Sequence, residues 1–187
     1  MGTIKTTNIE PIADNGTVTL GSSGDTFTVP SGVTVAGAMS NTPYFYGELA
    51  SNQTTTRAAY VKITGMTNNE LDSASAFDGT TFTVPNDQAG KYYLEGVMTA
   101  SYGSIGFDGE QTIGALYKNG SSLKESILRS DSSNAHIRAI TCVASGIFNL
   151  SVGDTIELYA KIQDSTGGDG LASSSKTSLQ GFKIIGA

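Results

Sequence analysis

An all-β fold is what the sequence predicts, and three observations lead to it. Charged residues make up only 15% of the chain, and 23 glycines together with many Ser, Thr and Asn residues fill their place. This composition disfavours helices, because Ser, Thr and Asn compete for helical hydrogen bonds and Gly carries a high entropic cost there. Several short segments alternate apolar and polar residues, and tight-turn signals separate them at even spacing. Together these patterns are typical of a two-sheet Greek-key sandwich.

The first part of the chain, residues 1–43, contains only very short β-like segments, at 17–20, 26–29 and 33–35. Segments of this length do not form an independent sheet. We therefore expect residues 1–43 to be an arm or stalk that either stays flexible or pairs with partner chains. The head domain is predicted to span residues 44–187.

The head is predicted to hold about ten strands. The most regular is 155–163, in which Ile156, Leu158, Ala160 and Ile162 face inward. Asn119-Gly120, after the strand 113–118, is the strongest short turn signal of the chain. The other predicted strands are 44–49, 59–64, 81–84, 91–99, 137–143, 146–150 and 178–185. A low-complexity surface loop is expected at 164–175.

Turn signals are densest between residues 70 and 100. The segments 81–84 and 91–99 flank the polar turn 86–90, which predicts an antiparallel β-hairpin.

Segment 91–99 also carries more large apolar side chains than one sheet face buries. We therefore expect self-association. The residues predicted for the core and the subunit contacts are Phe82, Tyr92, Tyr93, Leu94, Val97, Met98 and Phe182.

The bulk composition excludes several classes of function. The net charge is −6 and the eleven basic residues are scattered, so no nucleic-acid partner is expected. No segment approaches the roughly 20 apolar residues of a spanning helix, and no signal peptide is recognised, so membrane insertion is not expected. Cys142 is the single cysteine, which rules out an intrachain disulfide and predicts a small buried hydrophobe.

Candidate catalytic groups are few. His136 is the only histidine, and neither a second zinc-ligating histidine nor a nucleophile motif accompanies it. An enzyme and a cofactor are therefore not expected. The carboxylates of Asp108, Glu110, Asp164 and Asp169 fall in predicted loops, where they either hold a hard cation or are simply solvated. Whether these carboxylates bind a metal ion stays open at this point.

Six motifs stand in a recognisable order. They are Ala76-Phe77-Asp78, Phe82-Thr83-Val84-Pro85, Gly90-Lys91-Tyr92-Tyr93-Leu94, residues 116–120 (LYKNG), residues 150–158 (LSVGDTIEL) and residues 178–184 (SLQGFKI). This order resembles the globular head of complement component one subcomponent q, in the tumour necrosis factor-like jelly-roll superfamily. Leu179 stands where that family usually has an aromatic residue. The resemblance implies a ten-stranded jelly roll, a compact homotrimer, chain ends at the base and long loops at the apex.

A second resemblance covers residues 15–35, NGTVTLGSSGDTFTVPSGVTV. This segment is similar to amino-terminal segments of structural proteins of tailed bacteriophages, especially marine ones. It implies a virion protein, assembled in the host cytoplasm, whose residues 1–43 contact other virion proteins.

Two functions follow from the two resemblances. One is a trimeric tail-fibre or receptor-binding protein whose apex loops contact a host polysaccharide or receptor. The other is a capsid decoration (cement) or head-fibre protein, which the short chain favours. For the first function the predicted apex-loop binding residues are Tyr102, Phe107, Asp108, Glu110, Asp164 and Asp169. Exposed rings of Tyr102 and Phe107 would stack on sugars, and packing under a loop is the alternative for both.

Overall fold

A computed structural model describes residues 19, 22–26, 28–31, 33, 41–102, 109–130, 139–164 and 169–184. The chain divides into two compact units, Met1–Val35 and Ala36–Ala187. The described residues of the first unit contain no strand, so the strand predicted at 26–29 is not observed in them. Most of the segments predicted at 17–20 and 33–35 lies outside the described residues.

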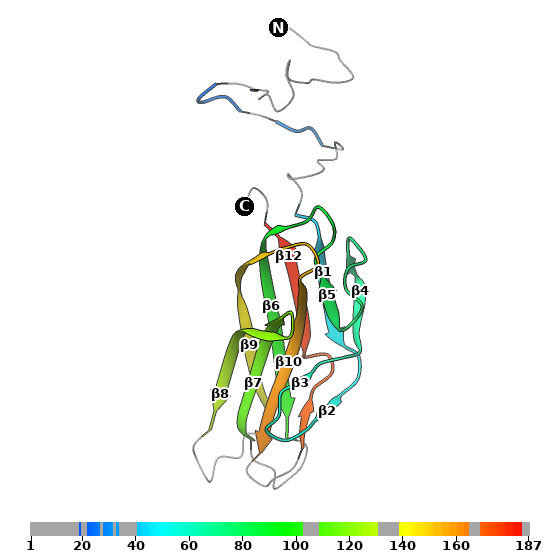
Figure 1. Cartoon of the computed structure of the whole chain (residues 1–187), viewed down its shortest axis with the longest axis vertical. Helices are drawn as coiled ribbons and strands as arrows, with labels where there is room; N and C mark the ends of the chain where they lie inside the picture. Colours follow the sequence, from blue (N-terminus) through cyan, green and yellow to red (C-terminus); the bar gives the residue numbers. More distant parts are fainter. Residues whose placement is uncertain are drawn as a thin grey trace. The chain divides into compact units, whose positions relative to one another are not determined.

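Two antiparallel sheets make up the second unit (Figure 1). The larger sheet has seven strands in the order β2-β11-β6-β12-β1-β4, and β9 pairs with the other edge of β6. Its strands are β1 Tyr44–Leu49, β2 Gln53–Thr55, β4 Met66–Asp72, β6 Gly90–Ser101, β9 Ala139–Leu150, β11 Gly170–Ala172 and β12 Ser178–Lys183. The smaller sheet has five strands in the order β3-β10-β7-β8, and β5 also pairs with β10. Its strands are β3 Val61–Lys62, β5 Thr81–Thr83, β7 Gly109–Lys118, β8 Ser121–Arg129 and β10 Thr155–Asp164.

The two sheets enclose one apolar core, so the predicted all-β jelly-roll sandwich is confirmed. Period-two alternation decides which side chains enter it. On β10, the residues Ile156, Leu158, Ala160 and Ile162 are fully buried and the residues between them are half-buried, as predicted. Gly96 on β6 has no room for a side chain, because a Cβ there would collide with Leu116 and Leu158 of the opposite sheet. Cys142 is buried in this core, as predicted.

The predicted hairpin of 81–84 and 91–99 is wrong. Strand β5 pairs with β10, and β6 pairs with β9, β11 and β12, so the chain crosses between the sheets after Pro85. Phe82 and Tyr92 enter the same core from opposite sheets, with ring centroids 5.9 Å apart. Alternation identifies a strand but does not identify its partner.

Other strand predictions need smaller corrections. The segments predicted at 137–143 and 146–150 form one strand, β9, because β6 pairs with it without interruption from Ala139 to Leu150. The strand predicted at 59–64 shortens to β3. Strands β2, β4 and β8 were not predicted, and β11 lies inside the segment that was predicted to be a loop. Their sequences carry little alternation of apolar and polar residues, so the pattern did not mark them as strands.

The sandwich has two distinct ends. At the base end the chain enters β1 and leaves β12, and the N–H of Lys183 donates a hydrogen bond to the carbonyl of Pro43 at 3.0 Å. At the apex end, Ser101 pairs with Ala139 and Gly109 pairs with Asp164 (Figure 1). The implied placement of the chain ends on the base side is confirmed for the described residues. Among these residues no helix is long and apolar enough to cross a bilayer.

Two of the six motifs meet at the base end. The tight turn of Asn119 and Gly120 joins β7 to β8, and both residues have positive φ, as a type I′ turn requires. Asp154 accepts hydrogen bonds from the Asn119 amide at 2.7 Å and the Ser151 N–H at 2.7 Å, and it forms an ion pair with Lys118 at 2.7 Å. Burial raises the pKa of Asp154, but these three donors outweigh it and lower that pKa below its usual value.

Candidate functional site

The outer face of the seven-stranded sheet carries an apolar row that crosses four strands. Strand register places Tyr44 opposite Phe182, Phe182 opposite Tyr93, and Tyr93 opposite Ile147. Directly opposite residues project from the same face of a sheet, so the four side chains line up across β1, β12, β6 and β9. Phe182 and Tyr93 pack with ring centroids 5.5 Å apart. We call these four residues the apolar row.

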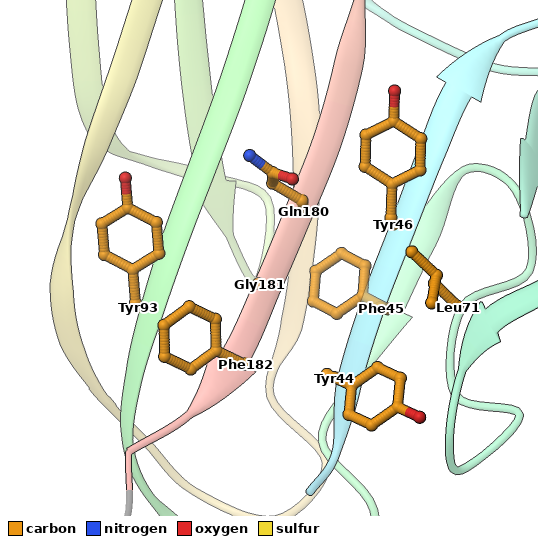
Figure 2. Close-up of a pocket in the computed structure, with 8 residues that line it drawn as sticks. All are labelled: Tyr44, Phe45, Tyr46, Leu71, Tyr93, Gln180, Gly181 and Phe182. Atoms are coloured by element: carbon orange, nitrogen blue, oxygen red, sulfur yellow. The ribbon is translucent and has the colours of Figure 1, made fainter. Parts of the chain in front are cut away.

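A pocket of about 230 Å³ opens at the β1 end of the apolar row (Figure 2). It is lined by Tyr44, Phe45, Tyr46, Leu71, Tyr93, Gln180, Gly181 and Phe182. Figure 2 shows Tyr93 beside Phe182 on one side and Tyr44, Tyr46 and Leu71 on the other. Tyr44, Leu71 and Phe182 are 41%, 49% and 39% exposed, which is high for large apolar side chains that share one patch.

The other end of the apolar row protrudes. Ile147 on β9 is 62% exposed, and Val143 on the same strand is 46% exposed. Both project from the face that carries the pocket, because they lie opposite Tyr93 and Val97 of β6. Strand β9 is the edge of the sheet on this side, and β4 is the edge beyond the pocket. The face therefore has a hollow near one edge and an aliphatic ridge at the other.

Polar residues lie next to the apolar row, and they form hydrogen bonds with one another and with Tyr93. Glu95 accepts hydrogen bonds from the Tyr93 hydroxyl at 2.7 Å and the Gln180 amide at 2.6 Å. The hydrogen bond to Glu95, followed by partial burial, raises the pKa of Tyr93. This network fixes the rings beside the pocket in one orientation.

The residues predicted for the core and subunit contacts fall into two sets. Phe82, Tyr92, Leu94 and Met98 are fully buried between the sheets. Tyr93, Val97 and Phe182 project from the outer face of the seven-stranded sheet. The sequence analysis missed Tyr44, Leu71 and Ile147, because the register that aligns them with Tyr93 and Phe182 is not readable from single strands.

Three of the four predicted apex carboxylates, Glu110, Asp164 and Asp169, lie around Arg57, a residue that the sequence analysis did not single out. Arg57 donates from its guanidinium to the main-chain carbonyl of Asp164 at 3.0 Å and lies 3.9 Å from the side chains of Asp164 and Glu110. Its main-chain N–H donates to Asp169 at 3.0 Å. Asp164 is only 2% exposed and ends strand β10, so the alternative of a simply solvated loop carboxylate is wrong for it. The described residues contain no group of three or more side chains suited to hold a metal ion.

Tyr102 is buried, so the prediction of an exposed sugar-stacking ring is wrong for this residue. Its hydroxyl bonds Thr112 Oγ1 at 2.6 Å and donates to the carbonyl of Gln111 at 3.1 Å. A Cβ at residue 109 would collide with this ring, so Gly109 allows the close packing. Burial raises the pKa of Tyr102 to about 12. Phe107, Asp108 and His136 lie outside the described residues.

Comparisons with known proteins agree on the fold. No family model matches the chain, and none of the curated proteins matches it. Among solved structures, murine APRIL at pH 5.0 matches with a TM-score of 0.53 and 14% identity, over 75% of this chain and 98% of that one. The Eiger TNF of S. frugiperda matches with a TM-score of 0.56 and 13% identity, over 77% and 92%. The globular domain of zebrafish complement 1qA protein matches with a TM-score of 0.52 and 14% identity, over 76% and 97%. The predicted likeness to this jelly-roll superfamily is therefore confirmed at the level of the fold.

Proposed function

We propose that the chain assembles as a homotrimer and acts as a binding head, without catalysis, on the virion of a tailed bacteriophage, where it attaches to a host surface. The observation that carries the proposal is the outer face of the seven-stranded sheet. Its pocket and its ridge lie toward opposite edges, and both expose apolar side chains to solvent.

The arrangement of hollow and ridge favours a ring over a twofold dimer. In a twofold dimer one patch meets its own copy, whereas in a ring one patch meets a different patch on the next subunit. Ile147 and Val143 of one copy are the complement in size and polarity to the pocket between Tyr44, Leu71 and Phe182 of the next. Three copies close such a ring in the jelly-roll assembly that the sequence resemblance implies.

The attachment role is supported by the two ends of the sandwich and by the amino-terminal resemblance. The chain enters and leaves at the base end, so residues 1–43 connect to the rest of the virion from there. The apex end then faces away from the connection. The similarity of residues 15–35 to phage structural proteins is what supports a place on a virion in this proposal.

Self-association is tested with Ile147→Asp, which places a charge on the ridge. We expect the native protein to sediment at three times the 19.3 kDa mass of one chain, and the variant to sediment as a monomer. The matched control is Ile127→Asp on β8 of the other sheet, where the isoleucine is 58% exposed and the trimer should survive. A monomeric native protein contradicts the trimer.

The attachment role is tested on virions that carry the protein. Antibodies against the head should block adsorption to host cells, and purified trimer should compete with virions for those cells. Electron microscopy of labelled virions should place the head on the tail. Label on the capsid would instead establish the decoration role, and adsorption that neither reagent changes would overturn the attachment role.

A further inference from the structure

Three tyrosines form a cluster on the outer face of the five-stranded sheet. The rings of Tyr117 on β7 and Tyr159 on β10 stack at 4.0 Å with an interplanar angle of 23°. Tyr60, which precedes β3, lies 6.0 Å from Tyr117 and tilts by 52°. The Nζ of Lys161 lies 5.3 Å from the centre of the Tyr60 ring. We call Tyr60, Tyr117 and Tyr159 the tyrosine cluster.

Charged groups lie beside the tyrosine cluster. The Tyr60 hydroxyl donates to Glu125 of β8 at 3.0 Å, and burial followed by this hydrogen bond raises the pKa of Tyr60 to about 12. Lys62 forms an ion pair with Glu157, and it also donates to the Thr81 hydroxyl at 2.9 Å. The stacking of Tyr117 on Tyr159 and the hydrogen bond of Tyr60 to Glu125 order the rings before any ligand arrives, which reduces the entropic cost of binding.

The tyrosine cluster shields part of the sheet from solvent and still leaves polar groups accessible. Beneath it, Ala115 is fully buried although it lies on the outer face, opposite Tyr159. Tyr60 nevertheless remains 38% exposed. Among the described residues, the hydroxyls of Tyr117 and Tyr159 make no hydrogen bond. An apolar, rigid surface with hydroxyls at its rim is what a carbohydrate ring binds.

The local charges decide which carbohydrate fits. Two lysines, Lys62 and Lys161, stand beside two glutamates, Glu125 and Glu157, so the patch has balanced charge in a chain of net charge −6. An acidic polysaccharide gains no net electrostatic attraction from a patch with equal numbers of lysines and glutamates, and the net negative charge of the chain repels it. A neutral polysaccharide fits, because each sugar hydroxyl both donates and accepts and meets ammonium donors and carboxylate acceptors side by side.

We propose that the tyrosine cluster is a binding surface for a neutral polysaccharide, with pyranose C–H groups packed on the tyrosine rings and sugar hydroxyls bonded to Lys161 and Glu125. The electron-rich faces of the rings attract the partial positive charge of the C–H groups. The proposal rests on the attachment role above and names the ligand class of the head. It places sugar recognition on a sheet face, away from the apex residues Tyr102 and Asp164, which are buried.

Affinity electrophoresis tests the proposal. The full chain is run in native gels that contain dextran, mannan or soluble starch as neutral probes, and alginate as an acidic one. We expect at least one neutral polymer to retard the protein, and Tyr60→Ala or Tyr159→Ala to weaken that binding by about tenfold. Tyr60→Phe keeps the ring and should retain most of the retardation.

Sedimentation of each variant confirms that it keeps its fold and assembly. The proposal is overturned if no neutral polymer retards the protein, if both alanine variants are retarded like the native chain, or if alginate alone retards it. These outcomes are separable from the attachment role. If Tyr60→Ala competes with virions as well as the native head does, attachment stands and the tyrosine cluster is not its sugar site.

Discussion

The two halves of the sandwich are stabilised differently. Towards the base end, aromatic rings fill the core, and Phe45 stacks on Phe82 at 4.2 Å and lies 5.3 Å from Phe77. Towards the apex end, small and polar residues take over, and among the described residues the buried polar set there is Thr55, Thr99, Gln111, Thr112, Asp164 and Thr177. Among the described residues, the buried polar residue at the base end is Asp154.

The difference shows which parts of this fold tolerate change. The stability gained from buried aromatic rings depends little on which apolar residues surround them. A buried polar group, in contrast, needs a specific hydrogen-bond partner. Arg57 and Asp164 are 107 positions apart in the chain, and only the complete fold brings them together. The base half is thus held mainly by hydrophobic packing and short turns. The apex half relies more on polar contacts such as that of Arg57 with Asp164, and among the described residues Thr55 Oγ1 and Arg57 Nε are buried there without a hydrogen-bond partner.

The largest effect is expected from Phe82→Ala in the base half. The ring is fully buried against Phe45 and Tyr92, so its removal leaves a cavity. We expect the free energy of unfolding to fall by about 3–5 kcal/mol, measured by urea denaturation. A loss below about 1 kcal/mol, typical of surface positions, would contradict the assignment of the core to this half.

A smaller effect is expected from Arg57→Met in the apex half. The variant keeps most of the side-chain volume but leaves Asp164 without its guanidinium neighbour, and we expect a loss of about 2 kcal/mol.

The control for this pair is a double-mutant cycle. Combined with Asp164→Asn, the Arg57 change should cost clearly less than it does alone. Additive losses would mean that the two side chains are not coupled, and the contrast between the halves would then weaken.

The smallest effect is expected from Asp154→Asn at the base. It weakens the ion pair with Lys118, and a loss of about 1–2 kcal/mol is expected at neutral pH. Because folding lowers the pKa of Asp154, its stabilisation is complete above the unfolded-state pKa of about 3.9 and disappears as the pH falls through the lower folded-state value. Denaturation curves of the native and variant proteins should therefore converge as the pH falls through the folded-state pKa of Asp154. A gap that stays constant with pH would assign the loss to packing instead.

Local sequence signals predicted strands and turns well and the pairing of strands poorly. The alternation in 155–163 and the Asn119-Gly120 turn are local, and both are confirmed. The pairing of β5 with β10 depends on the whole topology, which is why the predicted hairpin failed.

The sequence analysis also predicted part of the candidate site. Tyr93 and Val97 were predicted as large apolar residues in excess of one sheet face, and Phe182 as a core or subunit-contact residue; all three project from the outer face. Their neighbours Tyr44 and Ile147 join them only through register across four strands. Arg57 sits in a segment without a periodic pattern, so no local signal marked it. Tyr60, Tyr117 and Tyr159 lie in predicted strands, but only the packing of these strands in one sheet brings the three rings together.

The hydrogen bond between Lys183 and Pro43 has a practical consequence for engineering. Because the entry and exit strands are direct neighbours, a linker of a few residues would join them without strain. The head is then a transplantable unit: it can be inserted into a surface loop of another protein, or circularly permuted with new ends in the exposed turn at Asn119 and Gly120. Such a permuted head would still present the outer face of its five-stranded sheet, with the tyrosine cluster, on any chosen carrier.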